Sequence, residues 1–161
     1  MAENIVMPSQ ATKEEIYKAL LPQLKALTKD ETNLIANLGN IAAGLHHNLS
    51  FFWTGFYLVE DEELVLGPFQ GPVACTRIAF GKGVCGTAWK EKQSILVPDV
   101  HQFSGHIACS ADSQSEIVVP VIKDQTVRMV LDIDSNRVNN FDEVDQEYLT
   151  KLAEYMASSL L

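Results

Sequence analysis

This chain of 161 residues lacks long apolar runs, an excess of basic residues and closely spaced pairs of cysteines. No apolar run approaches the roughly 20 residues that a membrane-spanning helix needs. Lysine and arginine number 12 against 21 aspartates and glutamates, and such an acidic surface disfavours binding to nucleic acids and to anionic membranes. The chain begins without the basic and apolar regions of a signal peptide, so we expect a cytoplasmic protein.

The three cysteines of the chain need an explanation in a protein expected to stay in a reducing compartment: Cys75, Cys85 and Cys109. Structural disulfides are unfavourable there, and the thiols that persist are buried, bound to metal or reactive. His101 and His106 precede Cys109, which makes a zinc site one interpretation. No closely spaced pair of cysteines accompanies the two histidines in the zinc-binding manner, and we therefore expect no metal.

Capping residues and apolar stripes predict helices at both ends of the chain. Thr12 and Glu15 form a capping box before a first helix, which Pro22 should bend or split. Asp30 is interpreted as the N-cap of a second helix, and Asp142 as the N-cap of a closing helix. Each of these helices carries an apolar stripe that suits packing against a sheet.

β-Branched and aromatic residues predict a series of strands between these helices. The predicted strands are Trp53–Val59, Leu64–Phe69, Val73–Ile78, Ser94–Val97, Glu116–Ile122 and Val127–Asp134. A glycine-rich turn over residues 81–86, which leads into a short helix through Trp89, and a long loop over residues 99–115 interrupt them, and loops of that length are often functional. Hairpin-like connections favour an antiparallel sheet flanked by helices, an α+β fold in a single domain over residues 1–161 with a loose lead-in at 1–11.

Several segments resemble the motifs of GAF domains: Gly81–Ala88, Ser115–Pro120, Val130–Ser135 and Phe141–Asp145. Within that family the chain is more similar still to the free methionine-R-sulfoxide reductases, on the segments Trp53–Tyr57, Gln70–Cys75, Gly83–Gly86 and His106–Cys109. The resemblance covers residues 12–160. It implies the GAF fold, with N-terminal and C-terminal helices flanking a central antiparallel β-sheet and a long active-site loop. The family usually has a glycine where this chain has Gln125.

The resemblance implies a thiol-dependent reduction of free L-methionine-(R)-S-oxide to L-methionine. It places the nucleophile at Cys109, which attacks the sulfoxide and is left as a sulfenic acid. A second cysteine condenses with it to an intramolecular disulfide, which thioredoxin is expected to reduce, and no bound cofactor is implied. Cys75 is favoured as this partner over Cys85, whose place at a helix start should still favour its thiolate.

Two aspartates lie two residues apart on one predicted strand, so Asp132 and Asp134 point to the same face of the sheet. Such a pair is commonly solvated, but the resemblance places a ligand pocket on this strand and on the one that opens with Glu116. We expect the three carboxyls to bind the substrate ammonium and to supply a proton, because crowding raises the pKa of one of them. Trp53 is expected to form a pocket wall around the substrate methyl group. Tyr57, on the same face, is expected equally as pocket wall and as ordinary core.

Two other functions remain open from the sequence: a GAF domain that senses a small molecule without catalysis, and a thiol sensor of oxidants. In the first, loss of Cys109 would leave ligand binding unchanged. In the second, peroxide would form a disulfide without turnover of methionine sulfoxide. The resemblance also implies a homodimer with the amphipathic N-terminal helices as contact surfaces. The expected partners are free methionine sulfoxide, thioredoxin and a second copy of the chain, with neither nucleic acid nor membrane.

Overall fold

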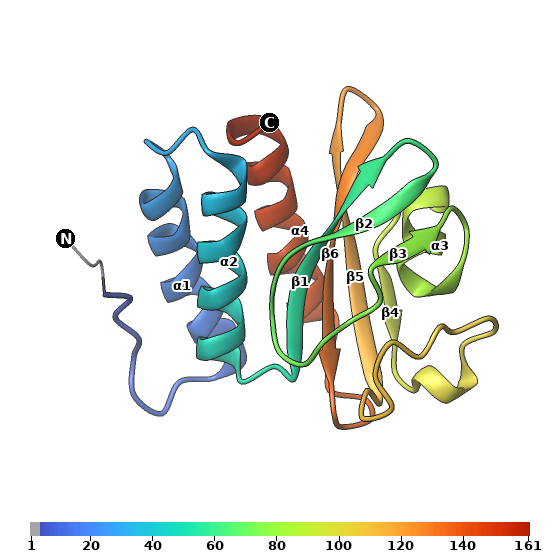
Figure 1. The fold of residues 1–161 in the computed structure, drawn as a ribbon. Coiled ribbons are helices and arrows are strands. Elements are labelled where there is room, and N and C mark those ends of the chain that lie inside the picture. Colours follow the sequence, from blue (N-terminus) through green and yellow to red (C-terminus); the bar gives the residue numbers. More distant parts are fainter. Residues whose placement is uncertain (1–3) are drawn as a thin grey trace.

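Two helices open the chain and pack side by side, as their apolar stripes predict (Figure 1). In the computed structural model, which describes residues 4–161, these are α1 (Lys13–Thr28) and α2 (Leu34–Leu49). The predicted capping box opens α1. The Thr12 side chain accepts a hydrogen bond from the backbone N–H of Glu15, whose carboxylate accepts one from the N–H of Thr12.

Helix α2 begins later than predicted. Its N-cap is Asn33, whose side chain accepts a hydrogen bond from the N–H of Ala36 at 3.0 Å, and Asp30 lies in the turn before it. Asparagine and aspartate serve about equally well as N-caps, so the sequence alone does not decide between them. Of the bend or split predicted at Pro22, the split does not occur, because α1 continues through this residue to Thr28.

A six-stranded antiparallel sheet forms the centre of the fold, in the order β3-β2-β1-β6-β5-β4 (Figure 1). Its strands are β1 (Trp53–Glu60), β2 (Glu63–Gln70), β3 (Arg77–Ala79), β4 (Ile95–Val97), β5 (Ser115–Lys123) and β6 (Thr126–Ser135). Tight turns join β1 to β2 and β5 to β6. The α+β architecture with an antiparallel sheet, predicted from the sequence, is confirmed.

One predicted strand is largely a loop. The segment Val73–Ile78 alternates in a strand-like manner, but only Arg77–Ala79 form β3 beside β2. The side chains of Trp53 and Tyr57, both on β1, donate hydrogen bonds to backbone carbonyls just before β3. These bonds hold the segment away from the ladder of the sheet.

The two faces of the sheet are covered by different elements (Figure 1). One face packs on α1, α2 and the closing helix α4 (Glu143–Ser159), and it buries Phe56, Leu131 and Ile133 completely. The opposite face is covered by α3 (Gly83–Glu91) and by the loop that follows β4, which begins with a 3-10 helix, η1 (Val100–Gln102). The helical face therefore forms the larger apolar core, with a few buried polar side chains such as Asp145, and the buried carboxyls of the sheet, Glu116 and Asp132, lie on the other face.

Both ends of the chain are held against the helical layer. Asp142 caps α4 as predicted, accepting hydrogen bonds from the N–H groups of Val144 and Asp145. The lead-in has neither helix nor strand over residues 4–11, but the backbone of Val6 pairs twice with the Gln23 side chain at 2.8 Å. The first three residues of the predicted lead-in lie outside the described part. Over residues 4–161, no helix combines the length and apolarity needed to span a membrane.

Candidate active site

Two aromatic side chains of β1 hold the loop that carries Cys75. Trp53 Nε1 donates to the carbonyl of Pro72 at 3.0 Å, and Tyr57 Oη donates to the carbonyl of Cys75 at 2.9 Å. The two rings stack with their centroids 6.0 Å apart. Both side chains are almost completely buried and both line a cavity beneath the loop. Tyr57 is therefore pocket wall and core residue at once.

A disulfide joins Cys75 to Cys109, with the two Cα atoms 5.2 Å apart. It links the loop before β3 to the long loop between η1 and β5, in which the N–H of Cys109 donates to the carbonyl of Ile107 at 3.0 Å. Both cysteines are half-buried, and Cys109 lines the cavity. The structure thus brings together the pair of cysteines favoured from the sequence and leaves Cys85 as a free thiol.

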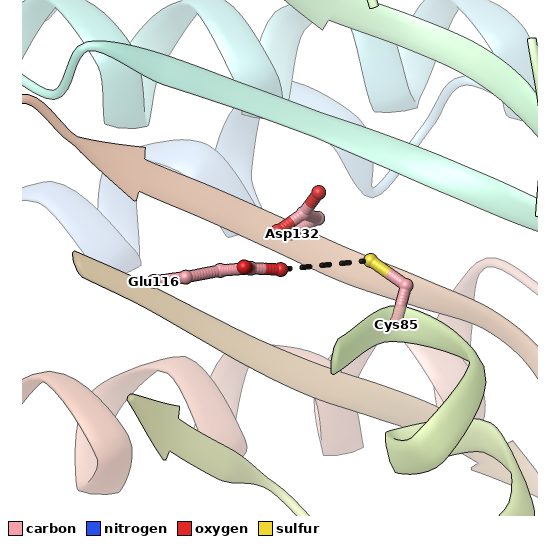
Figure 2. A group of neighbouring side chains, drawn as sticks. All are labelled: Cys85, Glu116 and Asp132. Carbon is pink, nitrogen blue, oxygen red and sulfur yellow. Dashed lines mark hydrogen bonds between the residues drawn. The ribbon is translucent and has the colours of Figure 1, made fainter. Parts of the chain in front are cut away.

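Cys85 lies in the first turn of α3, where a glycine lets the helix approach the sheet closely. A Cβ atom on the neighbouring Gly86 would lie 2.6 Å from the carbonyl oxygen of Ala79. The thiol is buried, and its Sγ lies 4.0 Å from Oε1 of Glu116 (Figure 2). Burial raises the pKa of Cys85 well above its ordinary value, and the charges of Asp132 and Glu116 raise it further. The expected preference for thiolate is therefore wrong, because these effects outweigh the helix dipole.

The register of β5 and β6 brings the three predicted carboxyls together. Glu116 on β5 is paired directly with Asp134 on β6, and Asp132 follows two residues away on the same face. Ile133, between the two aspartates, is buried on the helical face as predicted. Figure 2 shows Glu116, Asp132 and Cys85 converging from β5, β6 and α3. One donor atom from each of these three lies within 4.8 Å of the others, so they could hold a metal ion.

Burial raises the pKa of all three carboxyls, but to different extents. Burial raises the pKa of Asp134 only to about 6, because the hydrogen bond donated by the Ser113 hydroxyl and the nearby His106 both oppose this effect. The pKa values of Glu116 and Asp132 rise well above the ordinary range, through burial and then through the charge of Asp134. The site therefore contains one carboxylate that ionises below neutral pH beside two that favour their protonated forms.

Sequence reasoning missed two polar contacts of the cluster. Ser113 is buried, and nothing in its local sequence marks it as the partner of a carboxylate 21 residues further along the chain. The sequence marks His106 only as a candidate metal ligand, whereas the structure places its Nε2 3.7 Å from Oε2 of Glu116. His101, the other histidine considered, is exposed and does not line the cavity.

The cavity combines three chemical environments on one small surface. It offers carboxyls at Glu116, Asp132 and Asp134, aromatic rings at Trp53 and Tyr57, and sulfur at Cys85 and Cys109. A ligand with a cationic group, an apolar end and a centre reactive toward a thiol would match all three.

Comparison with known proteins gives a consistent result. The GAF domain family matches residues 28–160. The free methionine-R-sulfoxide reductase of Saccharomyces cerevisiae is 42% identical, over 98% of this chain and 93% of its own length. That of Escherichia coli is 48% identical, over 87% and 86% of the two chains. The X-ray structure of free methionine-R-sulfoxide reductase from Neisseria meningitidis in complex with its substrate has a TM-score of 0.94 and 46% identity, covering 98% of this chain and 96% of that chain.

Proposed function

The chain belongs to the GAF domain family and, within it, to the free methionine-R-sulfoxide reductases, and we propose that it reduces free L-methionine-(R)-S-oxide to L-methionine. The observation that carries the proposal is the Cys75–Cys109 disulfide at a cavity also lined by Glu116, Asp132 and Asp134. Thiol-dependent sulfoxide reduction needs a nucleophilic sulfur and a proton donor, and this cavity supplies both.

The first step forms a sulfenic acid on Cys109. The Cys109 thiolate attacks the sulfoxide sulfur, the oxygen is transferred to Cys109, and one proton is taken up, so that methionine leaves with its sulfur reduced. We assign the donation of that proton to Glu116. Its burial and the neighbouring charge of Asp134 raise its pKa, which favours the protonated form that a proton donor needs.

The second step forms the disulfide that the structure contains. The Cys75 sulfur attacks the Cys109 sulfur, the new S–S bond replaces the S–O bond, and the oxygen leaves as water. A dithiol protein, thioredoxin in our proposal, then reduces the disulfide by exchange and is itself oxidised. Neither cysteine is fully buried, which supports access by such a partner.

Recognition of the free amino acid rests on charge. Asp134, with a pKa of about 6, is ionised at neutral pH and can pair with the substrate ammonium. An internal residue of a peptide has no α-ammonium and would leave this carboxylate unpaired, at a cost in binding. We propose that the substrate methyl group packs against the Trp53 ring. Trp53 on β1 is the register partner of Asp134 on β6, so the two residues lie side by side in the sheet.

A coupled assay tests the proposal directly. Oxidation of NADPH is followed with thioredoxin and thioredoxin reductase, and free methionine-R-sulfoxide, its S epimer and a peptide-bound sulfoxide are supplied separately. We expect turnover of the free R epimer alone, lost in Cys109→Ser. In a single turnover without thioredoxin, pre-reduced enzyme should yield methionine and the Cys75–Cys109 disulfide. No methionine in either format, from folded and reduced protein, would contradict the proposal and favour a ligand sensor.

We also propose that two copies of the chain associate through the N-terminal helical layer. Ile35 on α2 is 56% exposed, and a second copy of the chain could cover it. Light scattering at micromolar concentration should give the mass of a dimer, and the mass of a single chain would reject the idea.

A further inference from the structure

Three side chains that can each supply a metal-ligand atom converge in the cavity. Sγ of Cys85 and one carboxyl oxygen each of Glu116 and Asp132 lie within 4.8 Å of one another, and these residues are only 3%, 6% and 7% exposed (Figure 2). Oδ1 of Asp132 is completely buried and has no hydrogen-bond partner within residues 4–161. Buried polar atoms are almost always paired, so an unpaired one marks a place where an outside group binds.

We propose that these three residues, called the thiol–acid triad, bind a borderline-soft divalent cation such as Zn²⁺ in competition with the substrate. A thiolate and two carboxylates carry three negative charges, which a dication largely neutralises. Magnesium and calcium prefer oxygen ligands alone, whereas zinc accepts sulfur and oxygen together. On binding, the thiol proton and any carboxyl proton pass to the solvent.

The geometry fits zinc after a small adjustment. Zinc–sulfur and zinc–oxygen bonds of about 2.3 and 2.0 Å, set at a tetrahedral angle, place the two ligand atoms roughly 3.5 Å apart. The observed distance from Cys85 Sγ to Glu116 Oε1 is 4.0 Å, and the ligand atoms of all three residues lie within 4.8 Å of one another, so rotation of these side chains must bring the atoms somewhat closer together. The fourth position can be taken by water, or by His106, whose Nε2 lies 3.7 Å from the other carboxylate oxygen of Glu116.

The cation would act as an inhibitor and not as a cofactor. Glu116 and Asp132, which would bind the cation, belong to the cluster that we assign to the substrate ammonium and to proton donation. The cation and the substrate therefore cannot occupy the site together. This consequence rests on the proposed function, whereas the binding itself does not. Because Cys85 takes no part in the disulfide, the site persists in the oxidised enzyme.

The oxidised protein offers a clean test. With Cys75 and Cys109 tied in their disulfide, Cys85 is the only thiol that can bind a metal. Untagged, oxidised protein is titrated with Co²⁺, and we expect a cobalt–thiolate charge-transfer band that Zn²⁺ abolishes at one equivalent per chain. Calorimetry gives the zinc affinity. Absence of the band in folded oxidised protein would overturn the proposal.

Matched variants locate the site. Cys85→Ser should remove the band, and Asp132→Asn should keep it while weakening zinc binding roughly tenfold or more, since even outer contacts of metal sites are worth 10- to 100-fold. Asp61→Asn, in the exposed acidic turn between β1 and β2, removes a surface carboxylate and should change neither. Persistence of the band in Cys85→Ser, or an unchanged zinc affinity in folded Asp132→Asn, would refute the site. Cobalt binding without turnover of any sulfoxide would refute the proposed function and leave the cation site standing.

Discussion

Replacing Ser113 by alanine should shift the activity of the reductase toward alkaline pH. The Ser113 hydroxyl donates a hydrogen bond to Asp134, and this bond opposes burial in setting the pKa of that carboxyl at about 6. At pH 7 a group with this pKa is about 90% ionised, so most molecules offer an anion to the substrate ammonium.

The size of the shift follows from the strength of the lost bond. A hydrogen bond to a charged group contributes roughly 1.5–3 kcal/mol, and about 1.4 kcal/mol corresponds to a tenfold change in an ionisation equilibrium. The acidic limb of kcat/KM should therefore move upward by roughly one to two pH units. At pH 7 the ionised fraction would fall to between about 50% and 10%, so KM should rise roughly two- to tenfold while kcat changes little.

The assay is the thioredoxin-coupled reaction with free methionine-R-sulfoxide, run between about pH 5 and pH 9. Ser110→Ala is the matched control. Ser110 lies in the same loop and lines the same cavity, but its hydroxyl accepts a hydrogen bond from the N–H of Asp112, and within residues 4–161 it forms no hydrogen bond with a carboxyl of the cluster. An acidic limb of kcat/KM that stays near pH 6 in Ser113→Ala, or that shifts equally in Ser110→Ala, would contradict this role of Ser113.

Three further changes test the site and the fold. Glu116→Gln should lower kcat roughly 100-fold or more in the same assay at pH 7, because the proton donor is lost. Asp134→Asn should stabilise the protein against urea by about 1–3 kcal/mol at pH 8. Folding raises the pKa of Asp134 from 3.8 to about 6, so the protonated carboxyl contributes to the stability of the wild type at low pH, and this contribution is lost as the pH rises through 6. The advantage of Asp134→Asn over the wild type should therefore shrink near pH 4. Gln125 has a φ of 62° in the β5–β6 turn, and this left-handed conformation costs a non-glycine residue about 1 kcal/mol. Gln125→Gly should therefore raise the midpoint of thermal unfolding by about 2–4 °C.

Much of the fold could be predicted because its signals are local. The capping box at Thr12 and the N-cap at Asp142 lie next to the helices that they begin, and strand alternation is visible within a few residues. Local signals fail where two adjacent candidates compete, as Asp30 and Asn33 do before α2. There the choice depends on how the helix packs on the rest of the molecule.

The errors at the site come from contacts between distant parts of the chain. A strand-like pattern before β3 is overridden by the hydrogen bond from Tyr57 to the carbonyl of Cys75, 18 residues away. The helix start alone predicts a thiolate at Cys85, but burial and then the charges of Asp132 and Glu116, which lie far along the chain, raise its pKa. The gathering of Asp132, Asp134 and Glu116 is predictable only because strand alternation is combined with the family resemblance. The catalytic roles of these residues stay predictions for the assays above.

The Cys75–Cys109 link spans 34 residues of sequence, which include β3, α3, β4 and η1. In the chain-entropy account, closing a loop of that length stabilises the folded state by about 4 kcal/mol. In the proposed catalytic cycle, this cross-link is therefore formed and broken once in every turnover. A cell short of reductant would keep the enzyme in its disulfide-bonded form, which unfolds less readily and is therefore a poorer substrate for proteases. A cell rich in reductant would return it to the reduced form, which unfolds more readily. The lifetime of the polypeptide would then follow the supply of electrons that the reaction consumes.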